Sequence, residues 1–307
     1  MDTAIRDKKI IVVTGAGTGI GRSAAETLAR AGHAVYASMR DVEGEDRDRA
    51  AAVGALAAAE SLDLQAIQLD VLSEESCRAA ADAILAERGR VDVVVNNAGM
   101  LMLGVTEAFR TEQVLQVINT NAVSWLRVNR AFLPILRRQG EGLLVYVGSS
   151  SSHMVDPFIG PYAASKAAGD VLAETMHYEN SQYGIDSVIV MPGAYPSGTE
   201  HFRHAVHAAD VAVTAQYGRI NHLPAELPAR LNGMHAPGVR TDPAEVGERI
   251  RDVVAMAPGT RPLRLVVDPQ RRGLEQLNEL HRRLQEDSFR RLGIDQLITV
   301  RPDSGRR

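Results

Sequence analysis

Residues 9–21 read Lys9-Ile10-Ile11-Val12-Val13-Thr14-Gly15-Ala16-Gly17-Thr18-Gly19-Ile20-Gly21, an apolar strand-like run that opens directly into a glycine-rich turn. The residues that follow, from Ile20 to Ala31, carry apolar side chains at helical spacing. Glycines let the backbone turn sharply and let a phosphate approach it, and the free N–H groups at a helix N-terminus favour an anion. A strand before the glycines and a helix after them predict dinucleotide binding. The turn residues expected to contact the cofactor are Gly15, Gly17, Thr18, Gly19, Ile20 and Gly21.

Composition narrows the class of protein. The 307 residues are 45% apolar and carry a net charge of −4, so nothing in the charge favours a nucleic-acid partner. The N-terminus has no apolar signal-peptide core, and no apolar run approaches the roughly 20 residues that a membrane span needs. The single cysteine, Cys77, is expected to be a small core residue, and its isolation favours a reduced, cytoplasmic setting.

Short apolar runs alternate with helical segments along the chain. After residues 9–13, strands are expected at 34–38, 65–69, 91–95, 143–147, 187–191 and 263–267. Helices are expected after the N-cap Ser73, over 106–138 with a break, and over 162–183. This order predicts one α/β domain over 1–307, a doubly wound Rossmann-type parallel sheet of about seven strands with a C-terminal helical extension. Residues 194–240 are irregular, and 299–307 are expected to form a flexible tail.

A second group of residues points to acid–base chemistry. Tyr162 and Lys166 are four residues apart, so on a helix they share one face, and a nearby cation is expected to lower the pKa of the phenol. Such a phenol can exchange a proton with an alcohol or a carbonyl oxygen. Ser149 follows the strand at 143–147, at the sheet edge where ligands bind, and its hydroxyl could orient that oxygen. The serine run leaves Ser150 as an alternative.

Together, the glycine turn, Asn97-Ala98-Gly99, Ser149 and the Tyr162/Lys166 pair resemble the short-chain dehydrogenase/reductase family in its common single-domain form. The resemblance covers about residues 8–193. It implies hydride transfer between a nicotinamide and a carbonyl or alcohol carbon. Tyr162 would be the acid/base, and Lys166 would lower its pKa and hold the nicotinamide ribose. Among three asparagines on the middle helix, the family pattern selects Asn121 to hold a water in a proton relay. The resemblance also implies cofactor contacts from Asp70, Val71, Asn97, Ala98, Gly99, Pro192, Gly193 and Ser197.

The end of the second strand bears on the choice of cofactor. An acidic residue there would bind the ribose of NAD, whereas an arginine accommodates the 2′-phosphate of NADP. Here Met39 occupies the acidic position and Arg40 follows it, so NADP(H) is expected, with Arg22 a possible helper. The alternative is a solvated Arg40 paired with Asp41 or Glu43.

The function expected from these features is NADPH-dependent reduction of a carbonyl, or the reverse oxidation. Alternatives are a catalytically silent dinucleotide-binding regulator, or epimerase or dehydratase chemistry on the same scaffold. Residues 194–240 are expected to be a substrate lid facing a bulky, mainly apolar small molecule, because long loops often cover sites. His201, His204 and His207 do not share one helical face, so no metal site is expected. The resemblance implies a homodimer or homotetramer. The net charge and the lack of a long apolar run predict no nucleic-acid or membrane partner.

Overall fold

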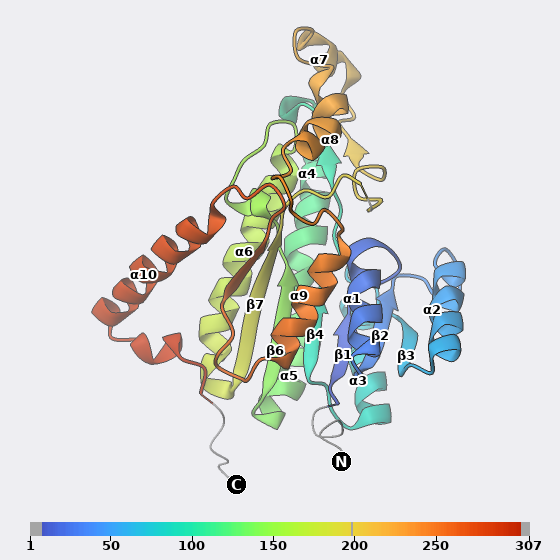
Figure 1. Cartoon of the computed structure of the whole chain (residues 1–307), viewed down its shortest axis with the longest axis vertical. Coiled ribbons are helices and arrows are strands. Elements are labelled where there is room, and N and C mark those ends of the chain that lie inside the picture. Colours follow the sequence, from blue (N-terminus) through green and yellow to red (C-terminus); the bar gives the residue numbers. More distant parts are fainter. Residues whose placement is uncertain (1–7, 198, 302–307) are drawn as a thin grey trace.

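A computed structural model describes residues 8–197 and 199–301 of the chain. Seven parallel strands form the main sheet in the order β3-β2-β1-β4-β6-β7-β9 (Figure 1). The strands are β1 Ile10–Val13, β2 Ala34–Met39, β3 Leu64–Gln68, β4 Val93–Asn96, β6 Gly142–Val147, β7 Ile185–Pro192 and β9 Arg264–Val267. The predicted fold class and its seven strands are confirmed, with most strand ends shifted by one or two residues.

Helices cover both faces of this sheet. They are α1 Gly19–Arg30, α2 Arg47–Glu60, α3 Glu74–Arg88, α4 Thr111–Ile118, α5 Ser124–Gln139, α6 Gly160–Asn180 and α9 Ala244–Ala255. The helix α10 (Leu274–Leu292) instead projects from the body of the protein and buries only its first residue, Leu274 (Figure 1). Neighbouring residues of β1 face opposite layers: Ile11 packs with α1 and α9, and Val12 packs with α3, α5 and α6. This two-sided burial explains why the strands are apolar throughout. Ser73 caps α3 as predicted, accepting a hydrogen bond from the backbone N–H of Ser76.

The expected break in the middle helix is a single wide turn. After the short 3₁₀ helix η1 (Thr106–Ala108), α4 continues through a π turn, η2 (Asn119–Val123), into α5. Such turns insert one extra residue and redirect the side chains that follow. Here the π turn contains Asn121 and packs against α6, which carries Tyr162 and Lys166.

Residues 194–240 are more regular than the sequence indicated. They contain the two-residue strand β8 (Val206–His207) and the helices α7 (Val211–Gln216) and α8 (Leu223–Gly233), which stand above the carboxyl ends of the strands (Figure 1). β8 pairs with β5 (Met102–Leu103) in a second, two-stranded sheet. The side chain of Gln270 holds the start of the segment, because it bonds both the N–H and the C=O of Ala194.

The last described residues bond the short helix that follows α6. Thr299 and Arg301, in the expected tail, bond Gln182 and Ser181 in the short helix η4 (Ser181–Tyr183). The rest of that expected tail, 302–307, lies outside the described residues. Within residues 8–197 and 199–301, no helix is both long enough and apolar enough to cross a bilayer.

Candidate active site

A cavity of about 470 Å³ lies at the carboxyl ends of the central strands. It crosses the point between β1 and β4 where the strand order reverses, which is where ligands bind in sheets of this kind. With the exceptions of Asn121 and Ser197, every site residue expected from the sequence lines it: Gly15, Gly17, Thr18, Gly19, Ile20, Gly21, Arg40, Asp70, Val71, Asn97, Ala98, Gly99, Ser149, Tyr162, Lys166, Pro192 and Gly193.

The glycine turn is closely packed where it meets the loop after β4. A Cβ atom on Gly15 would lie 2.8 Å from the Cα of Ala98, and Gly15 has a positive φ of 64°. A Cβ on Gly21 would lie 2.3 Å from Asn97 Nδ2. Asn97 Nδ2 itself donates hydrogen bonds to the carbonyls of Thr14 and Gly15. Asn97 therefore fixes the shape of the turn from the neighbouring strand.

The N-terminus of α1 is open toward the cavity. Its N-cap Thr18 makes no side-chain capping bond, and a Cβ on Gly19 would meet no atom within 4 Å. The first N–H groups of the helix therefore remain available, and this end of the dipole favours negative charge. Open space beside uncapped N–H groups fits the pyrophosphate of a dinucleotide.

Two of the arginines that line this cavity come from the end of β2 and from α2. Arg40 follows β2 with a side chain 62% exposed, and it forms an ion pair with the exposed Glu45. Arg49, from α2, has its Cδ 3.2 Å from the Cβ position of Gly17 and bonds Asp46 at 2.7 Å. The sequence analysis missed Arg49, because no local pattern brings α2 to the glycine turn. Arg22 does not line the cavity; it bonds Glu26 and the backbone of α2.

Tyr162 and Lys166 share the face of α6 that meets this cavity, as their spacing predicts. Lys166 Nζ donates to the carbonyl of Val147 at 2.8 Å and lies 5.9 Å from the centre of the Tyr162 ring. Burial lowers the pKa of Lys166 to about 8. Burial also raises the pKa of Tyr162, and the nearby Ser149 hydroxyl opposes this effect only in part. The sequence argument expected a lowered phenol pKa, and it was wrong here because it neglected desolvation.

The structure separates the two serines that the sequence left as alternatives. Ser149 Oγ accepts a hydrogen bond from the N–H of Ser151 at 3.1 Å, and Ser149 is the serine whose hydroxyl acts on the pKa of Tyr162. Ser150 Oγ instead accepts from Arg272 Nη2 at 2.6 Å. Ser149 is therefore the one placed at the phenol, and Ser150 points to the C-terminal part of the chain.

Asn121 lies behind the cavity wall and is fully buried. Its Oδ1 accepts from the N–H of Met100 at 2.8 Å, and its Nδ2 donates to the carbonyl of Met100 and to Ser165 Oγ, both at 2.9 Å. These bonds tie the loop after Gly99 to α6. Both amide hydrogens are donated to protein acceptors, so they are not available to hold the expected water.

Ser197 does not reach the cavity. It is exposed, and its Oγ accepts a hydrogen bond from Asn232 Nδ2 in α8 at 3.1 Å. Thr199, two residues later, lines the cavity instead, with its Oγ1 bonded to the carbonyl of Tyr195. Counting residues from Pro192 selected Ser197 because sequence spacing does not show how an irregular segment turns.

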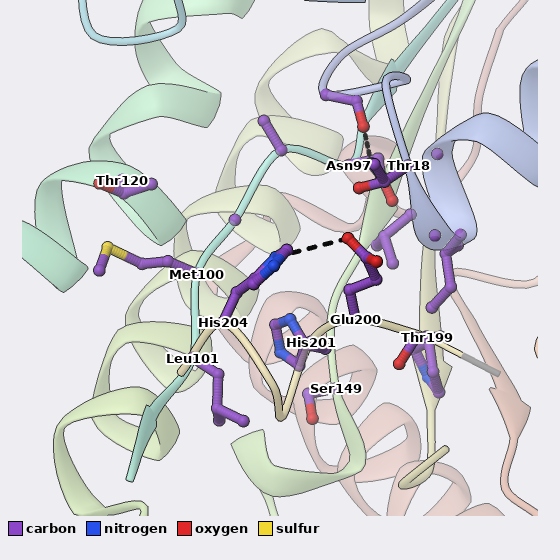
Figure 2. Close-up of a pocket in the computed structure, with 18 of the residues that line it drawn as sticks. Thr18, Asn97, Met100, Leu101, Thr120, Ser149, Thr199, Glu200, His201 and His204 are labelled. Carbon is purple, nitrogen blue, oxygen red and sulfur yellow. Dashed lines mark hydrogen bonds and ion pairs between the residues drawn. The ribbon is translucent and has the colours of Figure 1, made fainter. Parts of the chain in front are cut away.

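Residues 199–204 form one wall of the cavity. The His201 ring meets the Tyr162 ring edge to face, with centroids 5.7 Å apart, and burial lowers the pKa of His201 to about 4. His204 Nδ1 lies 3.6 Å from a carboxylate oxygen of Glu200. Figure 2 shows both histidines and Glu200 between Ser149 on one side and Asn97 with Thr18 on the other. His207 belongs to β8 and bonds the carbonyl of Leu103.

A doubly wound sheet, an uncapped glycine turn and a cluster of Ser149, Tyr162 and Lys166 are together typical of dinucleotide-binding oxidoreductases. A family model for short chain dehydrogenases matches residues 9–208. The chain belongs to the short-chain dehydrogenase/reductase family.

Individual relatives share the matched part of the chain. A 3-ketodihydrosphingosine reductase of Bacteroides thetaiotaomicron is 32% identical over 190 residues, covering 62% of this chain and 65% of the relative. The human 17-beta-hydroxysteroid dehydrogenase type 1 is 35% identical over 189 residues, covering 61% and 56%. The matched segments thus span less than two thirds of these two relatives.

Solved structures are similar over a larger share of the chain. A short-chain dehydrogenase from Streptomyces avermitilis is 28% identical and covers 94% of this chain and 98% of its own, with a TM-score of 0.69. An alcohol dehydrogenase from Thermococcus sibiricus, complexed with 5-hydroxy-NADP, is 26% identical and covers 85% and 96%, with a TM-score of 0.67.

Proposed function

We propose that the protein is an NADPH-dependent oxidoreductase that reduces a carbonyl to an alcohol, or runs the reverse reaction. The observation that carries this proposal is the buried cluster of Ser149, Tyr162 and Lys166 beside the open glycine turn. The bound nicotinamide would supply or accept the hydride at the carbon. A dinucleotide sensor would not need these acid–base groups, which favours an enzyme over a silent regulator.

The protein's own groups would handle the proton. The raised pKa of Tyr162 keeps the phenol protonated at neutral pH, which suits a group that gives a proton to the carbonyl oxygen during reduction. Ser149, whose hydroxyl acts on the pKa of the Tyr162 phenol, would orient that oxygen. Lys166 is a cation below its pKa of about 8, and a positive charge near the phenol stabilises the phenolate left after proton transfer.

The walls around Tyr162 favour a bulky and mainly apolar substrate. The cavity that contains Tyr162 carries apolar side chains as well as polar ones: Met100, Leu101, Ile159, Phe202 and Leu231 all line it. Phe202 and Leu231 come from residues 194–240, which we propose as the substrate lid. Relatives named for dihydrosphingosine, hydroxysteroids and retinol point to the same kind of substrate.

The proposed reaction is tested by following NADPH consumption with a panel of carbonyl compounds. We expect bulky apolar ketones to be reduced with a kcat/KM at least roughly tenfold above that of small hydrophilic carbonyls, since each buried CH₂ contributes about 0.8 kcal/mol. Turnover of small hydrophilic carbonyls alone would contradict the substrate class. NADPH binding without turnover of any compound would favour the silent regulator, and a redox-neutral product would favour epimerase or dehydratase chemistry.

Replacing Arg40 tests the choice of cofactor. Met39 stands where an acidic residue would bind a ribose hydroxyl, and the guanidinium of Arg40 suits a 2′-phosphate. Arg40→Ala should raise the KM for NADPH by about 10- to 100-fold, the value of a charge-assisted bond of about 1.5–3 kcal/mol, and leave the KM for NADH nearly unchanged. Arg47→Ala is the matched control, since Arg47 is exposed nearby on α2 but does not line the cavity. A wild-type preference for NADH would contradict the assignment.

A further inference from the structure

Arg272 reaches from the segment after β9 to the loop that carries Ser149. Its Nη2 donates to Ser150 Oγ at 2.6 Å, and its Nη1 lies 3.1 and 3.0 Å from the two carboxylate oxygens of Asp156. Ser150 directly follows Ser149, and Asp156 belongs to the loop that leads into α6. We call Arg272, Asp156 and Ser150 the arginine latch. All three residues line the cavity that contains Tyr162.

The backbone holds Arg272 in place from its own side. Arg271 has a φ of 50° and Gly273 a φ of 81°, so Arg272 lies between two residues in the left-handed region. That conformation is strained for Arg271 and persists only where the surroundings impose it. The N–H of Arg272 donates to Asp268 Oδ2 at 3.1 Å, and Asp268 is itself buried at the end of β9. This turn presents the guanidinium to the serine loop.

The latch is too buried to be an ordinary surface ion pair. The Arg272 side chain is 10% exposed and that of Asp156 is 19% exposed. The Nε of Arg272 has no hydrogen-bond partner among the described residues. This Nε lies 3.8 Å from Asp268 Oδ2, which is an ion pair too long for a hydrogen bond, so burying the guanidinium costs free energy that its partners offset only in part. What the arrangement does provide is fixed geometry, because a planar fork bonds two points of the segment between β6 and α6 at once.

We propose that Arg272 is a positioning residue that acts through Ser150 and Asp156 to hold Ser149 at Tyr162. This inference rests on the proposed function. The loop is otherwise closed mainly by its own bonds: Ser151 N–H to Ser149 Oγ, and Ser152 N–H to the Ser149 carbonyl. Arg272 adds a bond from a distant part of the chain. It lies beyond residues 9–208, the range that the family model matches.

The test combines turnover with hydrogen exchange, which does not need a substrate. Arg272→Ala should lower kcat by about 10- to 100-fold, because a small misplacement of a positioned group has effects of that order. The Kd for NADPH should stay within about threefold. Arg272→Lys keeps the charge but not the fork, so its kcat should lie between those of wild type and Arg272→Ala. In a protein that already carries Ser149→Ala, Arg272→Ala should lower kcat by less than a further factor of about three, because the hydroxyl that Arg272 positions is already absent.

Arg261→Ala is the matched control. Arg261 is an equally buried arginine paired with Asp186 at 3.0 Å, near the amino end of β7 and away from the cavity. The substitution Arg261→Ala should lower stability without changing the kcat of the folded protein by more than about threefold. Hydrogen exchange should quicken at the amides of Ser151 and Ser152 in Arg272→Ala and stay unchanged in Arg261→Ala.

The outcomes separate the two proposals. Quickened exchange together with no carbonyl turnover by the wild type would leave the positioning role standing and refute the proposed function. Unchanged exchange in Arg272→Ala would refute the positioning role, as would an effect on kcat that multiplies fully with that of Ser149→Ala. Equal losses of kcat in Arg272→Ala and Arg261→Ala would show a general structural effect and would also overturn it.

Discussion

Tyr162→Phe is expected to lose about 10²- to 10⁴-fold in kcat, the usual contribution of a positioned general acid. The substitution keeps the ring, its packing and its edge-to-face contact with His201, and removes only the oxygen that carries the proton. Affinity for NADPH should change little, because the uncapped turn at α1 that we expect to hold the pyrophosphate is untouched. Steady-state turnover and cofactor titration on the same preparation measure the two effects separately.

The chain offers a matched control for this substitution. Tyr146 in β6 is fully buried, and its hydroxyl accepts a hydrogen bond from Asn129 Nδ2 at 2.9 Å, but it does not line the cavity. Tyr146→Phe should therefore lower stability, by about 1–3 kcal/mol for the unpaired amide, and leave kcat nearly unchanged. Near wild-type turnover by Tyr162→Phe, or an equal loss in both variants, would remove Tyr162 from the role of acid.

The parts of the site that the sequence predicted correctly depend on short-range spacing. The glycine turn lies between a strand and a helix in direct succession, and Tyr162 and Lys166 are one helical turn apart. Local geometry of this kind holds wherever the element forms. The strand order then brings Ser149, at the end of β6, to the same edge as Asn97, after β4, and both were expected there.

The parts that the sequence did not predict depend on contacts between distant segments or on solvent exclusion. Arg49 and Arg272 reach the cavity from α2 and from the turn before α10, and no periodicity in the chain encodes either contact. The direction of the shift in the Tyr162 pKa depends on the burial of the phenol in the folded chain, which a helical spacing does not contain. Ser197 was misplaced for a similar reason, because Asn232 of α8 holds it outside.

Gly21→Ala is expected to weaken NADPH binding by about 100-fold. The added Cβ would lie 2.3 Å from Asn97 Nδ2 and 2.5 Å from the carbonyl oxygen of Gly15, both closer than real Cβ contacts allow. Asn97 would have to move, and its bonds to the carbonyls of Thr14 and Gly15 would break, so the turn would lose its shape. A loss of about 2.8 kcal/mol in the binding free energy of NADPH lies within the range of a charge-assisted bond to a phosphate, and it corresponds to the predicted change of about 100-fold in Kd.

Fluorescence titration with NADPH would measure this loss, and Gly54→Ala is its control. Gly54 lies inside α2, where a Cβ would meet no atom within 4 Å, so alanine there should stabilise the helix by about 0.5–1 kcal/mol and leave binding unchanged. Because a close-packed turn can also destabilise the whole fold, the melting temperature of each variant must be measured alongside its Kd. A folded Gly21→Ala protein that binds NADPH within about twofold of wild type would show that the phosphates do not lie on this turn.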